Sequence, residues 1–124
     1  MAEGMAAGVP DLSLIDTAAF SDLQAAAGAE FVAELVQTFA EEAPRMVDEL
    51  RTALAAGTAE PFRRTAHSLK SNSQTFGARH LAEQARALEH AGLGAGSTAT
   101  PASLDALSAE LQRTLRALQA LARG

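Results

Sequence analysis

One histidine of the chain stands where a helix would hold it toward solvent beside a lysine. If residues 64–77 (RTAHSLKSNSQTFG) are helical, His67, Lys70, Ser71 and Gln74 fall at i, i+3, i+4 and i+7 and share one face. A neutral imidazole has one nitrogen lone pair free for nucleophilic attack, and its ordinary pKa of about 6.5 keeps that form populated near neutral pH. The ammonium of Lys70 can offset negative charge on an incoming group. The spacing therefore indicates a helix that presents a nucleophilic histidine.

The opposite face of the same segment is apolar. Successive members of this face are spaced by 4, 3, 4 and 3 residues, and they are Phe62, Ala66, Leu69, Ser73 and Phe76. Gly77 follows the last of them, where the C-terminus of a helix often needs a left-handed residue. We therefore predict a helix from about Ala59 to Phe76 that buries this face and displays His67.

The motif around His67 resembles the phosphorylation motif of histidine-containing phosphotransfer (HPt) domains. These domains are helical-bundle phosphoryl carriers of two-component relays, and their usual pattern is H-x-[LIF]-K-G followed by small residues, a hydrophobe and Gly. This chain has His67-Ser68-Leu69-Lys70, then small or polar residues, then Phe76-Gly77. It departs from the pattern at Ser71, where the family usually has a glycine that gives a partner room to approach.

The resemblance implies a role for several side chains. His67 would be phosphorylated, and Lys70 would offset phosphoryl charge. Glu89 lies 22 positions after His67, the offset at which similar domains have a carboxylate that accepts a hydrogen bond from Nδ1 and so orients the ring. We assign Ser71, Gln74 and Arg63 to the partner-binding surface. Taken singly, Lys70, Gln74 and Glu89 are also compatible with ordinary surface side chains.

Other candidate residues near the motif fit the pattern less well. His80 and His90 have no lysine three residues on, so we interpret both as surface histidines. Arg86 precedes Glu89 by one helical turn and can either pair with it or meet the phosphoryl group.

Composition limits the classes of function. The chain has 124 residues, enough for a single domain with one core, and 48% hydrophobic but only 4% aromatic residues. Its net charge of −5 argues against binding nucleic acid. Without cysteine it has neither disulfides nor thiolate metal sites. No apolar run approaches the ~20 residues that span a bilayer, and the N-terminus lacks the basic residues of a signal peptide. We expect a cytoplasmic protein without a metal site.

The periodicity predicts an all-α fold. We expect an antiparallel up-down-up-down four-helix bundle with a short extra N-terminal helix, formed by one domain over residues 12–124, after a flexible leader or linker end over residues 1–11. The short helix should end near Gly28, and Pro44 should kink or break the long one. The loop from Gly92 to Pro101 offers little reason for order. The expected bundle helices are 29–56, 59–76, 78–92 and 102–122. On the first of these, the apolar side chains that share a broad face, and that we expect in the core, are Phe31, Leu35, Phe39, Met46, Leu50 and Leu54.

The chain has no nucleotide-binding G-x-x-x-x-G-K-[ST] loop and no H-E-x-x-H zinc motif, so it is not expected to be an enzyme with its own ATP site. The phosphoryl group and any Mg²⁺ would come from partners, namely a histidine kinase and receiver domains. The alternative is an interaction module of the same fold in which His67 is never phosphorylated, and the departure at Ser71 favours it. We expect a monomer, because each helix has one apolar face for the bundle interior.

Overall fold

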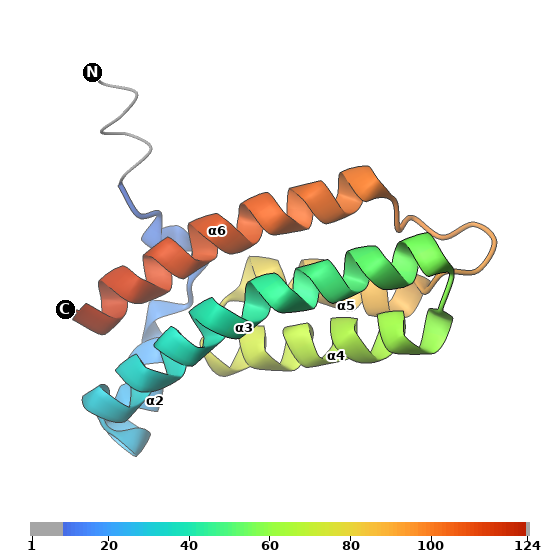
Figure 1. The fold of residues 1–124 in the computed structure, drawn as a ribbon. Helices are drawn as coiled ribbons and strands as arrows, with labels where there is room; N and C mark the ends of the chain where they lie inside the picture. Colours follow the sequence, from blue (N-terminus) through green and yellow to red (C-terminus); the bar gives the residue numbers. More distant parts are fainter. Residues whose placement is uncertain (1–8, 124) are drawn as a thin grey trace.

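A computed structural model describes residues 9–123, and within this range it contains helices and no strand. Figure 1 shows α3, α4, α5 and α6 side by side with alternating directions, and the shorter α2 at one end of the bundle. α3 packs against α4 and α6, and α5 packs against the same two helices. The predicted up-down-up-down bundle with a short extra N-terminal helix is therefore confirmed. The elements are η1 (Leu12–Leu14), α2 (Thr17–Ala27), α3 (Ala29–Ala56), α4 (Ala59–Thr75), α5 (Arg79–Ala91) and α6 (Pro101–Arg123).

The core consists of aliphatic and phenylalanine side chains from all five α-helices. Burying one such side chain contributes about 1.5–3 kcal/mol relative to leaving it exposed. Phe39 of α3 also packs against Phe76, with ring centroids 5.3 Å apart. The largest fully buried side chains include Phe20, Leu50, Phe62, Leu81 and Leu104.

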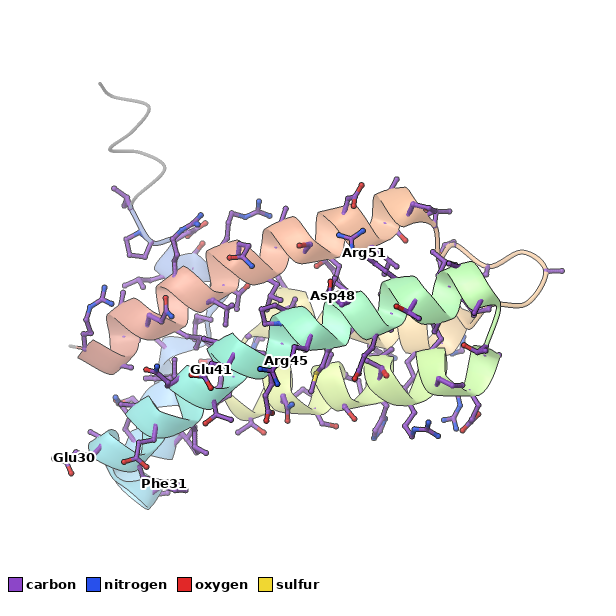
Figure 2. The ribbon with its side chains drawn as sticks, in the orientation of Figure 1. Glu30, Phe31, Glu41, Arg45, Asp48 and Arg51 are labelled. Carbon is purple, nitrogen blue, oxygen red and sulfur yellow. The ribbon has the colours of Figure 1, made fainter. Side chains whose placement is uncertain are left out.

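At its N-terminal end, the buried face of α3 is rotated by about one residue from the face that side-chain size alone suggests. The sequence shows two similar stripes on this helix, one with Phe31 and Leu35 and the other with Val32 and Val36. The valines are 0% and 2% exposed, whereas Phe31 is 52% exposed. Figure 2 shows Phe31 next to Glu30 at the N-terminal end of α3. The interpretation of Phe31 as a core residue is wrong.

Pro44 lies inside α3, which continues through it from Ala29 to Ala56. Of the two expected outcomes, a kink or a break into two helices, the break does not occur. Proline removes one backbone hydrogen bond and costs about 3 kcal/mol in a helix interior. α3 tolerates this because it buries seven side chains, among them Ala43, Val47 and Leu50, between α4 and α6. Packing therefore overrides the local preference.

The segment before α6 is better tied down than its composition suggests. Ala99 is buried, and the Ser97 hydroxyl donates to the carbonyl oxygen of Gly92. Thr100 and Ser103 cap the start of α6 reciprocally, each backbone N–H donating to the other's hydroxyl oxygen, at 2.8 and 3.0 Å. This arrangement has the logic of a capping box. The expectation of little order in this loop is wrong.

The predicted leader, residues 1–11, lies outside the described residues up to residue 8. Asp11 caps η1, since its Oδ1 accepts from the backbone N–H of Ser13 at 3.1 Å. Within residues 9–123, every helix is too short or too polar to serve as a membrane span.

Candidate functional site

The site is built on α4, whose apolar face fixes the rotation of the helix. Every member of the predicted face, from Phe62 to Phe76, is at most 4% exposed. Ser73 is the polar member, and its hydroxyl donates to the backbone oxygen of Leu69 at 2.7 Å, which satisfies it inside the core. With that face buried, His67 projects outward and its side chain is 55% exposed.

His67 is hydrogen-bonded to Glu89 of the neighbouring helix α5. Nδ1 of His67 lies 2.7 Å from Oε2 of Glu89, and Nζ of Lys70 lies 2.9 Å from Oε1 of the same carboxylate. One carboxylate thus binds both side chains of the His-x-x-Lys motif, one with each oxygen. Because Glu89 is 19% and Lys70 20% exposed, these two groups form a partly shielded base beneath the imidazole.

The electrostatics of this triad select one tautomer of the ring. The hydrogen bond from Lys70, followed by that from His67, lowers the pKa of the Glu89 carboxyl below its usual value of 4.5. Glu89 is therefore ionised at neutral pH and can only accept hydrogen bonds. A neutral His67 must then have its proton on Nδ1, which leaves the lone pair on Nε2. The lone pair is therefore on the nitrogen that faces away from the carboxylate.

The residues assigned to partner binding surround His67 on the same exposed face. Ser71 and Gln74 are exposed on the turns that follow it. Arg63 lies one turn before it and pairs with Glu60, its Nε donating to Oε1 at 3.2 Å. The three residues are therefore accessible, and their roles remain predictions.

Arg86 does not pair with Glu89 in the structure. Its Nη1 lies 3.7 Å from Oε1 of Glu83, while the two oxygens of Glu89 bind His67 and Lys70. His80 and His90 are exposed. His90 nevertheless lies in a groove beside Lys70 and Glu89, which its position in the sequence did not indicate.

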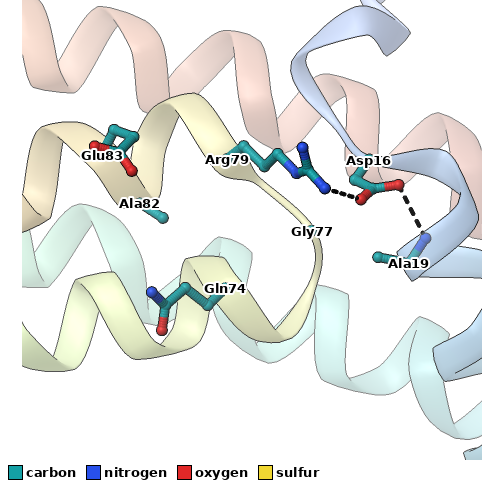
Figure 3. Close-up of a pocket in the computed structure, with 7 residues that line it drawn as sticks. All are labelled: Asp16, Ala19, Gln74, Gly77, Arg79, Ala82 and Glu83. Carbon is teal, nitrogen blue, oxygen red and sulfur yellow. Dashed lines mark hydrogen bonds and ion pairs between the residues drawn. The ribbon is translucent and has the colours of Figure 1, made fainter.

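A clasp at one end of the bundle was not recognised from the sequence. The backbone N–H of Asp16 donates to the oxygen of Gly77 at 2.7 Å, and Oδ2 of Asp16 lies 2.6 Å from Arg79 (Figure 3). The backbone N–H of Ala19 holds the pKa of the Asp16 carboxyl below its usual value, and Arg79 acts in the same direction. The clasp joins α2 to the turn between α4 and α5, where a hollow of about 510 Å³ is lined partly by Gln74.

Gly77 permits this close approach. Its φ of +75° favours glycine, and a Cβ there would lie 2.9 Å from the backbone oxygen of Asp16. The F-G pair of the motif thus has a structural function. The signal in the sequence was present, since an N-capping aspartate begins α2 and a glycine ends α4, but nothing in the pattern links them.

No group of three or more histidine, aspartate or glutamate side chains within residues 9–123 is placed to hold a metal ion. The arrangement therefore offers one oriented nucleophile, one ammonium and one carboxylate. Such a set can accept an electrophilic group on Nε2 and stabilise positive charge that develops on the ring.

Comparison with known proteins agrees with this geometry. The family model described as Hpt domain matches residues 34–121, which include α4, α5 and most of α3 and α6. No curated protein and no solved structure matches the chain significantly. Since the family model spans most of the chain and includes His67, Lys70 and Glu89, the chain belongs to the Hpt domain family, whose members are phosphotransfer modules.

Proposed function

We propose that this domain accepts a phosphoryl group on Nε2 of His67 and passes it to or from an aspartate of a receiver domain. The observation that supports the proposal most directly is the 2.7 Å contact of Nδ1 with Glu89, which leaves Nε2 as the exposed lone-pair nitrogen. Family membership supports the same class of activity.

The chemistry balances without an additional base. In the acyl phosphate of a phospho-aspartate, Nε2 attacks phosphorus, the P–N bond forms and the P–O bond to the aspartate breaks, which regenerates a carboxylate. The ring becomes an imidazolium-like group with its proton retained on Nδ1, and the adjacent Glu89 carboxylate stabilises that positive charge. In the reverse direction the same contact holds the ring while the phosphoryl group leaves.

Lys70 has a double role in this proposal. It neutralises Glu89 in the resting domain, and its ammonium, bonded to the same carboxylate as the imidazole, can offset charge on the phosphoryl oxygens when they arrive. Mg²⁺ and the remaining stabilisation come from the receiver, and the phosphoryl group enters the relay from a histidine kinase, since the domain has no ATP-binding loop. Arg63, Ser71 and Gln74 contact the partner around the ring.

Transfer from a radiolabelled phospho-receiver tests the proposal, with wild type and His67→Gln side by side. We expect an acid-labile, alkali-stable label on the wild type and none on the variant. Binding without any label, across several receivers and kinases, would instead support the interaction module that Ser71 favours. Label that persists in His67→Gln would move the phosphorylation site to His80 or His90.

A further inference from the structure

A groove with an excess of basic side chains lies beside the His67–Glu89 pair. It has a volume of about 870 Å³ and is lined by residues of α4, of α5 and of the segment that follows α5. Its polar lining is formed mainly by Arg63, Lys70, Arg86, Glu89, His90 and Thr98, and we refer to it as the basic groove.

The basic groove carries a positive charge, whereas the net charge of the whole chain is negative. Arg63, Lys70 and Arg86 face a single carboxylate, Glu89, although the net charge of the whole chain is −5. Glu60 and Glu83, which pair with the two arginines, are not part of the lining, and their side chains are 62% and 74% exposed. Exposed ion pairs of this kind contribute little to stability, so each guanidinium can exchange its partner for another anion at little cost.

The shape and lining of the groove restrict the kind of anion. Its volume is that of a site for a whole small molecule or a peptide segment and far exceeds the space that a single phosphate needs. No phenylalanine, tyrosine or tryptophan lines it, and its one aromatic ring is the imidazole of His90, so a nucleobase would find little surface on which to stack. Two guanidinium groups on different helices, Arg63 and Arg86, suit successive carboxylates of an extended chain, each of which can be bound by two parallel hydrogen bonds.

We propose that the basic groove binds an acidic segment of the protein that exchanges the phosphoryl group with His67. This proposal rests on the proposed function, because it assigns a surface of the same site to the partner. Lys70 and Glu89 belong both to the groove and to the triad beneath the imidazole, so a segment in the groove lies beside the ring. The segment fixes the orientation of the partner and increases the rate of encounter by electrostatic attraction.

A titration with a short poly-glutamate peptide tests the groove directly. The arginine Nε–H signals of the full chain are followed by NMR in the wild type and in His67→Gln, which keeps the groove and lacks the nucleophile. We expect saturable shifts of Arg63 and Arg86 in both proteins. Arg63→Gln/Arg86→Gln should bind at least about tenfold more weakly, since two charge-assisted contacts are lost. Arg51→Gln is the matched control, because it removes an ion pair with Asp105, 2.7 Å long, outside the groove.

Each outcome decides the proposal. Raising salt from about 0.01 M to about 1 M shortens the Debye length from about 30 Å to about 3 Å and should abolish the shifts. Equal shifts at Arg51 and Arg113 would mean nonspecific attraction and would overturn the proposal, as would the absence of any shift. Saturation by inorganic phosphate and not by the peptide would make the groove a phosphate site instead.

A parallel reaction separates this proposal from the proposed function. Phosphoramidate, a small donor that loses ammonia as its phosphoryl group moves to Nε2, labels histidine without any protein partner. Label on the wild type and none on His67→Gln supports the nucleophile whatever the peptide does. Peptide binding in the groove without label on His67 would overturn the relay function and would show that the groove binds an acidic segment of some other partner.

Discussion

Replacing Glu89 by glutamine should move the imidazole proton to the wrong nitrogen. The carboxylate accepts from Nδ1 of His67 at 2.7 Å and from Lys70 at 2.9 Å. An amide of the same shape has only one oxygen to accept and one NH₂ to donate. It cannot satisfy both neighbours, so its orientation decides the tautomer of His67.

The ammonium should win this competition. A hydrogen bond from a charged donor is roughly twice as strong as one from a neutral donor, which corresponds here to a preference of about tenfold for the amide oxygen to face Lys70. The NH₂ group then faces Nδ1, which must accept, and the proton moves to Nε2. Since Nε2 is then blocked in most molecules, we expect phosphorylation of His67 in Glu89→Gln to slow by about tenfold from the tautomer alone, and by more once the lost negative charge is included.

A second substitution makes this reasoning refutable. In Glu89→Gln/Lys70→Met the competing ammonium is gone, so the amide oxygen can turn to His67 and the proton should return to Nδ1. The tautomer is measured from the imidazole ¹⁵N shifts at about pH 8, above the ordinary histidine pKa of about 6.5, with the exposed His80 and His90 as internal controls. The rate of labelling by phosphoramidate is measured beside it.

The two changes are predicted to be strongly non-additive in the tautomer, as expected for groups that share one hydrogen-bond network. If Glu89→Gln keeps its proton on Nδ1 and its labelling rate, Glu89 does not orient the ring. If the double variant keeps the proton on Nε2, the competition between Lys70 and His67 for one oxygen is the wrong explanation.

The remaining predictions concern stability and pH. Gly57→Ala should cost about 1–2 kcal/mol because its backbone is left-handed. Gly77→Ala should cost about 1–3 kcal/mol more, because of these two glycines only Gly77 would bring the new Cβ against a backbone oxygen, at 2.9 Å. Urea denaturation measures both losses of stability, and equal losses would disprove the close contact. Phe31→Ser should change stability by less than about 0.5 kcal/mol and Val32→Ala should cost about 2 kcal/mol, since the two side chains are 52% and 0% exposed. A larger loss for Phe31→Ser would mean that the stripe of α3 with Phe31 is the buried one. The pKa of the Glu89 carboxyl is lowered from 4.5, so its contribution to stability is present above about that pH and is lost as pH falls through the lower folded value. A ¹³C titration of this carboxyl with a midpoint at or above 4.5 would contradict the pairing.

Much of the fold could be predicted because each helix has a clear apolar face. The face of α4 needed only its spacing, and the structure buries all of it. On α3, however, two stripes compete, and the buried one includes Ala43 and Ala53, which allow close packing of helices but score low when residues are ranked by bulk. Phe31 was therefore misassigned, since the choice depends on the neighbouring helices rather than on α3 itself.

The ion pairs of the site show a second limit. From the sequence, Arg86 can reach Glu83 or Glu89, which lie three residues to either side of it. In the structure Glu89 binds His67 and Lys70 of α4, and Arg86 pairs with Glu83. The contacts of Glu89 with α4 are not described by spacing along α5, so that spacing alone does not distinguish the two pairings.

The position of Glu89, in contrast, follows from the numbers of residues that separate His67 and Glu89 from Gly77, without comparison with related proteins. His67 lies ten residues before Gly77 and Glu89 twelve residues after it, so at 1.5 Å per residue both lie about 15–18 Å from the turn. In two antiparallel helices joined by one turn, residues at equal distances from the turn lie side by side. Leu88 is 6% exposed and must face the core, which places the next residue at the flank of that face, beside α4.

The other acid of α5 fails this test. Glu83 lies six residues nearer the turn, about 9 Å lower along the helix, and is out of reach of the ring. The clasp between Asp16 and Gly77 holds the turn from which both counts begin. One residue inserted between Gly77 and Leu81 would therefore shift Leu88 and Glu89 together if the turn kept its shape. α5 could keep Leu88 buried and Glu89 on His67 only if the turn itself changed. The offset of 22 residues is a property of this hairpin, and the orientation of His67 depends on the turn as much as on its own motif.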